Sequence, residues 1–106
     1  MDRQQVEDYI LGLPGTQLEY PFGKRLVVYK TNGDMLALMV EDSDPLQLSL
    51  KCDPQLAVLL RQKYETVMPA GRLNKKYWNT LLLTGQLPWP EVQGLIRHSY
   101  ELLLKS

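Results

Sequence analysis

Residues 26–40 read Leu-Val-Val-Tyr-Lys-Thr-Asn-Gly-Asp-Met-Leu-Ala-Leu-Met-Val and carry the clearest structural signal in the chain. Two apolar runs flank the Asn32-Gly33 pair, and this arrangement is the strongest short-range signal for a β-hairpin. A type I′ turn needs positive φ at both central positions, which Asn and Gly tolerate. With Asn32 and Gly33 as the loop, we expect Tyr29 to pair with Leu36 and Val27 with Leu38.

Outward from the hairpin, apolar spacing predicts the remaining elements. Helices are expected at about 2–11, 53–64 and 88–104, and further strands at 16–20, 46–50 and 78–83, with one more near Val67. Asp2 and Asp53 are expected N-caps. The strand at 46–50 alternates Leu with Gln and Ser, so one of its faces is expected to be wet. The fold class that follows is α+β: a two-layer sandwich, with a mostly antiparallel sheet and the helices packed on one face.

Composition narrows the class of protein. The chain has 106 residues, of which 44% are apolar and 23% charged, and this fits a single globular domain spanning 1–106. The longest uninterrupted apolar run covers only 35–40, far short of the about 20 residues that span a bilayer. There is one cysteine and no N-terminal signal pattern. We therefore expect a soluble, cytoplasmic protein.

Catalytic and cofactor chemistry finds little support in the sequence. The one Cys and the one His, Cys52 and His98, are far from ligand spacing, so no metal site is expected. The acidic loop 41–45 lacks the calcium-loop pattern, and no glycine-rich phosphate cradle is present. Cys52 stands at a helix start, where a thiol pKa is lowered, so a Cys52–His98 dyad stays open as a third and weaker reading. We expect no enzyme activity and no cofactor.

The segment 71–80 carries the strongest binding signal. It reads Gly-Arg-Leu-Asn-Lys-Lys-Tyr-Trp-Asn-Thr, and it lies in the half of the chain with net charge +4, whereas residues 1–50 carry −4. Cations bind phosphate, aromatic rings stack on bases, and amides read polar edges. Asn74 is expected to cap a turn that orients the neighbouring lysines. The alternative is a solvated loop in which Trp78 anchors a core strand and Asn79 points to the opposite face.

The sequence also resembles the MmcQ/YjbR family over nearly its whole length. The residues that carry the resemblance form an ordered series: Pro21-Phe22-Gly23, Leu48 to Pro54, Leu60-Arg61 with Tyr64, Pro69 to Trp78, Gly85, Leu87-Pro88 and Ser99-Tyr100. The resemblance implies a compact fold similar to that of CyaY and of secretion chaperones. It further implies a DNA-binding role through a double-wing arrangement, and it brings no catalytic residues.

The leading hypothesis is therefore a small DNA-binding protein without catalytic activity. The residues expected to contact the DNA backbone are cationic or carry amides: Arg72, Asn74, Lys75 and Lys76, with Lys51, Arg61 and Lys63 as a second rim and Lys24, with Arg25, on a wing. The second hypothesis is a protein-interaction module that holds a peptide or a second subunit on its sheet face or in a helix groove. Exposure of Tyr20 or Trp89 would favour it.

Overall fold

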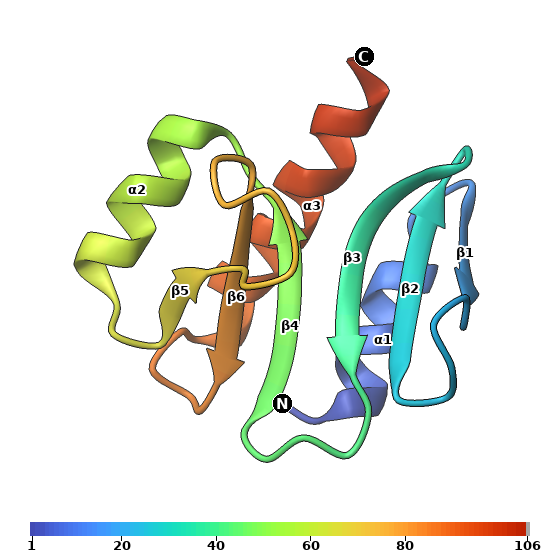
Figure 1. The fold of residues 1–106 in the computed structure, drawn as a ribbon, viewed down its shortest axis with the longest axis horizontal. Coiled ribbons are helices and arrows are strands. Elements are labelled where there is room, and N and C mark those ends of the chain that lie inside the picture. The colour runs from blue at the N-terminus through green and yellow to red at the C-terminus, as the bar shows by residue number, and fades with distance from the viewer. Residues whose placement is uncertain (106) are drawn as a thin grey trace.

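The computed structural model describes residues 1–105 and contains three helices and six strands, close to the expected order (Figure 1). In chain order they are α1 (Arg3–Leu11), β1 (Thr16–Glu19), β2 (Leu26–Thr31), β3 (Asp34–Val40), β4 (Leu46–Lys51), α2 (Pro54–Lys63), β5 (Val67–Pro69), β6 (Trp78–Leu83) and α3 (Trp89–Leu104). The short strand predicted near Val67 is β5. Within residues 1–105 no helix combines the length and the apolar character needed to cross a bilayer.

The strands form one sheet in the order β1-β2-β3-β4-β6-β5, and every neighbouring pair is antiparallel. All three helices contribute to a single apolar core against one face of this sheet, with Ile10 from α1, Leu60 from α2 and Ile96 from α3 among its members. In Figure 1 α1 and α3 lie behind the strands, and no helix formed by residues 1–105 lies on the near face of the sheet. The predicted two-layer α+β architecture is confirmed. We call the two sides the covered face and the open face.

The hairpin forms where the sequence placed it, but its register differs from the prediction. Asn32 and Gly33 have φ of 53° and 89°, as a type I′ turn requires. Beyond Lys30 and Met35, however, a β-bulge inserts Leu36, so Tyr29 pairs with Ala37 instead of Leu36. Val27 likewise pairs with Met39, and Leu38 with Val28. The expected pairs were wrong by one residue because the bulge lets both Leu36 and Ala37 be buried.

The first two helices begin at side-chain caps, as predicted. The Asp2 carboxylate accepts a hydrogen bond from the Gln5 N–H at 2.8 Å. The Asp53 carboxylate accepts hydrogen bonds from two backbone N–H groups at 3.1 Å, and Pro54 occupies the first turn. These caps satisfy backbone donors that have no partner within the helix. Both helix starts are therefore fixed by local sequence.

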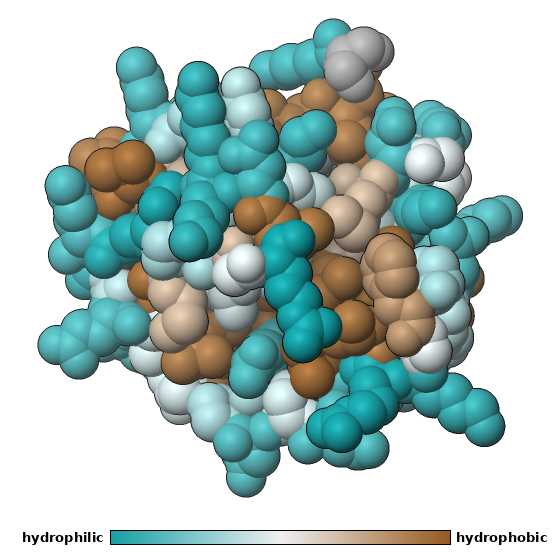
Figure 2. Space-filling model, viewed as in Figure 1, coloured by the Kyte–Doolittle hydropathy of each residue, from teal (hydrophilic) through white to brown (hydrophobic). Residues whose placement is uncertain are grey.

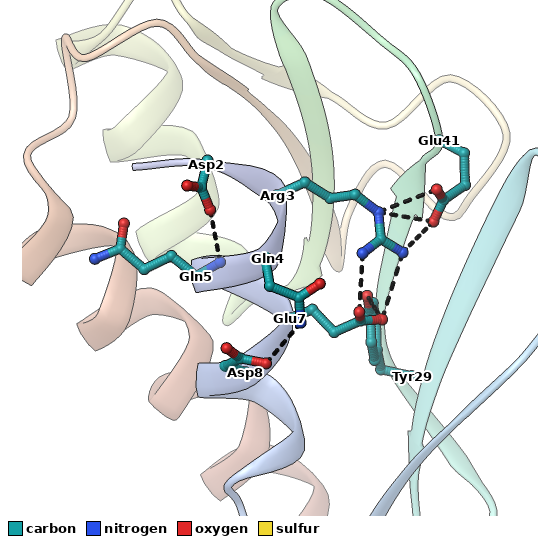
Figure 3. Close-up of polar contacts among 8 residues, drawn as sticks. All are labelled: Asp2, Arg3, Gln4, Gln5, Glu7, Asp8, Tyr29 and Glu41. Atoms are coloured by element: carbon teal, nitrogen blue, oxygen red, sulfur yellow. Dashed lines mark hydrogen bonds and ion pairs between the residues drawn. The ribbon is translucent and has the colours of Figure 1, made fainter.

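A charged cluster of four side chains, the Arg3 cluster, fastens α1 to the sheet (Figure 3). The Arg3 guanidinium donates to both carboxylate oxygens of Glu41, just beyond β3, and at 2.8 Å to Glu7. The Tyr29 hydroxyl donates to Glu7 at 2.9 Å. Burial, together with the Glu7 hydrogen bond, raises the pKa of Tyr29 well above its usual value, and the hydrogen bonds to Glu41 and Glu7 raise the pKa of Arg3. Each charged group of the Arg3 cluster therefore has a hydrogen-bond partner within the cluster.

Candidate functional site

The open face of the sheet has a mixed apolar and polar surface. Strand pairing aligns Val28, Leu38, Ser49 and Thr80 in one cross-strand row. A second row joins Leu26, Val40 and Gln47. The hydroxyls of Ser49 and Thr80 share a hydrogen bond of 2.8 Å. In Figure 2, which has the viewpoint of Figure 1, apolar surface gathers at the middle of this face, among hydrophilic side chains.

Two loops border this surface and turn it into a groove of about 940 Å³, which we call the sheet groove. One loop, residues 20–25, joins β1 to β2, and the other, residues 70–77, joins β5 to β6. The groove is lined by Phe22, Gly23, Lys24, Arg25, Leu26, Leu38, Val40, Gln47, Ser49, Ala70, Gly71, Arg72, Leu73 and Thr80. This set includes three cations and no carboxylate.

The 20–25 loop places an aromatic ring and two cations at the rim. The backbone N–H of Gly23 donates to the Tyr20 carbonyl at 3.3 Å, and the N–H of Leu26 donates to the Gly23 carbonyl at 3.4 Å. Gly23 has φ of 99°, which L side chains rarely adopt, so glycine suits this turn. Phe22 precedes it and is 67% exposed. A large apolar side chain left this open, beside Lys24 and Arg25, is available to a ligand.

The opposite rim of the groove is the 70–77 loop, where Asn74 and the neighbouring Trp78 were singled out from the sequence. Trp78 shares the open face with Thr80, yet it is only 8% exposed and lies outside the helix-covered core. In Figure 1 the 70–77 loop crosses over this face of the sheet. The Asn74 side chain accepts a hydrogen bond from the Lys76 N–H at 3.0 Å, which is the turn role expected for it. Trp78 is thus a buried residue at the start of β6, next to the loop that forms this rim, while Asn79 points to the covered face and donates to the Ala57 carbonyl.

Of the eight residues that the sequence singled out, the structure brings Arg72 and Lys24 to the sheet groove, together with Arg25 of the expected wing. The other six, Asn74, Lys75, Lys76, Lys51, Arg61 and Lys63, do not line it. Arg61 instead donates to the Lys75 carbonyl at 3.1 Å and so supports the 70–77 loop. Lys63 lies over the Tyr64 ring and Lys76 over the Tyr77 ring, at 5.2 and 5.6 Å from the ring centres.

Sequence reasoning missed Phe22 and the apolar floor of the groove. The sequence did contain one signal for Phe22. It is an aromatic residue between Pro21 and Gly23, in a turn whose formation does not require an aromatic side chain. No comparable signal existed for Leu38 and Val40, because the bulge at Leu36 decides which face they occupy. The wet face predicted for β4 is the open face, where Gln47 and Ser49 line the groove.

Cys52 does not have the surroundings of a nucleophile. It is 4% exposed and belongs to the covered core. Burial, with a smaller effect of the neighbouring Asp53 charge, raises its pKa to about 11, so the thiol stays protonated at neutral pH. His98 accepts a hydrogen bond at 3.1 Å from the backbone N–H of Asp53 and supports the start of α2. Within residues 1–105 no three His, Cys, Asp or Glu side chains gather in a way that could hold a metal ion.

An antiparallel sheet with one helix-covered face and one grooved, cation-rimmed face defines a small two-layer α+β protein. The YjbR family model matches residues 11–102, and the chain belongs to this family. It is 31% identical over 101 residues to the uncharacterized protein YjbR of Escherichia coli K12, covering 95% of this chain and 86% of that protein. It is 30% identical over 108 residues to the uncharacterized protein YbdF of E. coli O157:H7, covering 98% and 88%.

Solved structures share the fold closely. The crystal structure of the Deinococcus radiodurans protein DR2400 superposes with a TM-score of 0.92 at 34% identity, covering 97% of this chain and 78% of that one. A crystal structure of a Pseudomonas syringae protein superposes with a TM-score of 0.82 at 31% identity, covering 96% and 98%. The architecture described above is therefore that of experimentally solved proteins.

Proposed function

We propose that the protein is a cytoplasmic DNA-binding protein, without catalytic activity of its own, and that it binds through the sheet groove. The observation that carries the proposal is the meeting of Lys24 and Arg25 from one loop with Arg72 from the other around one recess. None of the three side chains has an ion-pair or hydrogen-bond partner within residues 1–105. Cations left without partners beside a recess that has no carboxylate favour an anionic ligand, and phosphate is the anion that arginine binds best.

The expected binding is electrostatic and of modest strength. Three phosphate contacts predict that the logarithm of the binding constant falls with the logarithm of salt concentration with a slope of about −3 on duplex DNA and about −2 on a single strand. The chain has no net charge, and the acidic loop 41–45 follows β3 directly. Long-range attraction therefore adds little to the local contacts.

The test compares two charge-reversal variants with the same change in net charge. The groove variant is Lys24→Glu/Arg25→Glu/Arg72→Glu, and its matched control, Lys63→Glu/Lys75→Glu/Lys76→Glu, changes exposed lysines that do not line the groove. Fluorescence anisotropy with labelled DNA, single-stranded and duplex, is expected to show binding by the wild type and the control at low salt and its loss in the groove variant. The single change Arg72→Glu is expected to weaken binding on the order of tenfold and to reduce the salt slope by about 1.

Two results would contradict the proposal. If the wild-type protein binds neither form of DNA at low salt, DNA binding is wrong. If the control variant loses binding while the groove variant keeps it, binding occurs through the basic loop and helix positions and the groove is the wrong site. Thermal unfolding of each variant establishes that its fold is intact.

A protein-interaction module is the second candidate, favoured by exposed apolar side chains near one sheet edge. Leu18 and Tyr20 are 39% and 43% exposed, and Phe22 follows them. β1 is an edge strand, so its free backbone groups can pair with an added strand. Trp89, in contrast, packs against the core and meets the Tyr9 ring edge to face. Light scattering, and capture of a partner from nuclease-treated lysate by wild type but not by Tyr20→Glu, would support this function.

A further inference from the structure

We infer that the sheet groove receives a single-stranded segment of DNA, with the Phe22 ring stacked on a base and the cations of the two rims on the flanking phosphates. This inference rests on the proposed function and specifies its substrate class. It follows from the shape of the site, from the exposed ring and from the chemistry of the floor.

The shape of the site is concave. Proteins read duplex DNA by inserting a helix or a β-ribbon into a groove of the DNA, where the base edges are accessible. The sheet groove is instead a recess bordered by two loops, and in a duplex the base faces are stacked and cannot enter it. A single strand can turn its bases into such a recess and keep its phosphates at the rims.

Phe22 supplies the stacking surface. Its side chain is 67% exposed on the same rim as Lys24 and Arg25, and two backbone hydrogen bonds shape the turn that carries it. Base stacking on an aromatic ring tolerates any sequence because every base has a π-face. The ring and the cations together are the two components by which proteins bind single strands without sequence preference.

The floor suits the bases that follow. Leu38 and Val40 offer apolar contact, and Ser49, Thr80 and Gln47 offer hydroxyl and amide groups for base edges. Its volume of about 940 Å³ falls within the range of about 300–1,000 Å³ for small-ligand pockets. The groove therefore holds a segment of a few nucleotides.

The experiment measures the affinity of wild type and variants for labelled oligothymidylate and for a duplex of equal length. We expect the wild type to bind the single strand more tightly than the duplex. Phe22→Ala is expected to weaken single-strand binding about 5- to 140-fold, which corresponds to the about 1–3 kcal/mol of one base–aromatic stack. Phe22→Trp is expected to retain binding, and Phe22→Leu to weaken it about as much as Phe22→Ala does, because the ring is what stacks. Tyr77→Ala is the matched control, since Tyr77 is 39% exposed and does not line the groove.

The outcomes separate this inference from the proposed function. Equal affinity for both forms of DNA, with Phe22→Ala unchanged, would overturn the single-strand inference and leave DNA binding in place. Absence of binding to either form would overturn both. Tighter binding of a labelled peptide rich in acidic and aromatic residues than of oligothymidylate would also overturn the inference, in favour of a protein partner.

Discussion

The cations on the two faces of the sheet differ in whether they have partners within the protein. On the covered face Arg3 is surrounded by carboxylates, with Glu7 at 2.8 Å and Glu41 at 3.0 Å, and the Tyr29 hydroxyl completes the cluster. On the open face Arg72 and the two cations of the opposite rim line a groove that contains no carboxylate. Both sets are basic residues on loops or helix ends. Glu7, four residues after Arg3, is a partner that the sequence itself offers, whereas Glu41 reaches Arg3 only through the fold.

The difference shows how to separate structural charges from functional ones. A charge whose donors are all satisfied within the protein contributes to the fold, and removing its partner leaves an unpaired group that is costly to bury. A charge that faces a recess without a partner contributes little to stability and is free to bind an anion. Substitutions in the Arg3 cluster and at Arg72 test this distinction, and a pH experiment of intermediate effect tests the burial of Cys52 on the covered face.

The largest effect is expected from Glu7→Ala on the covered face. It removes the acceptor of the Tyr29 hydroxyl and one of the two carboxylates that neutralise Arg3. We expect a loss of about 3 kcal/mol in the free energy of unfolding, at the low end for a broken buried pair because the Arg3 side chain is 30% exposed. Urea denaturation measures it. A loss below about 0.5 kcal/mol would mean that the cluster is not structural, and DNA affinity serves as the readout that should stay constant.

A pH effect of intermediate size is expected from Cys52 in the covered core. Burial raises its pKa in the folded state from the ordinary value of 9.0 to about 11. Between about pH 9 and 11 the unfolded chain releases this proton while the folded protein keeps it, so stability is complete below pH 9 and falls as pH rises through this window. The loss is on the order of 2 kcal/mol, since each pKa unit corresponds to about 1.36 kcal/mol.

Unfolding measured from pH 7 to 11 checks this expectation, with Cys52→Ala as the comparison. The variant should lose the part of the decline that begins near pH 9 and keep the part due to Tyr29, whose raised pKa acts in the same direction at higher pH. Identical pH profiles for the two proteins would contradict the assignment to Cys52. Slow reaction of Cys52 with thiol reagents at pH 7 is expected from the same cause.

The smallest effect is expected from Arg72→Gln, with Arg3→Gln as its matched counterpart on the other face. Arg72 has no partner within residues 1–105, so its loss should change the free energy of unfolding by less than about 0.5 kcal/mol. Arg3→Gln should cost about 1–2 kcal/mol because it leaves the Glu7 and Glu41 carboxylates without their cation, while Glu7 keeps the Tyr29 hydrogen bond. Thermal denaturation should show that Arg3→Gln lowers stability more than Arg72→Gln does. DNA affinity, measured in parallel, should be lowered more by Arg72→Gln than by Arg3→Gln. The same ranking in both measurements would break the distinction between the faces.

Local sequence was sufficient to predict those features of the fold that depend on neighbouring residues. The Asn32-Gly33 turn, the Asp2 and Asp53 caps and the approximate bounds of the elements follow from residues a few positions apart. The register beyond Tyr29 was not predictable, because the bulge at Leu36 depends on what the core can bury on the covered face. That single insertion places Leu38 on the open face and so contributes to the floor of the groove.

The candidate site was predictable only in part. The basic segment 71–80 drew attention to Arg72, but its other cations do not line the groove, and Lys24 and Arg25 come from a distant turn. The division into an acidic and a basic half, −4 and +4, does not describe the groove either, since its cations come from both halves.

The elements, the hairpin, the antiparallel α+β class and the family could be predicted from the sequence, because they depend on local periodicity, turn chemistry and motif order. Which charges have partners and which are free depends on the tertiary structure. Positions far apart in the chain come together in two places. Arg3 pairs with Glu41, and the groove on the open face is lined by Lys24, Arg25 and Arg72. Such meetings depend on strand order and register, which are set by how the whole core packs rather than by neighbouring residues.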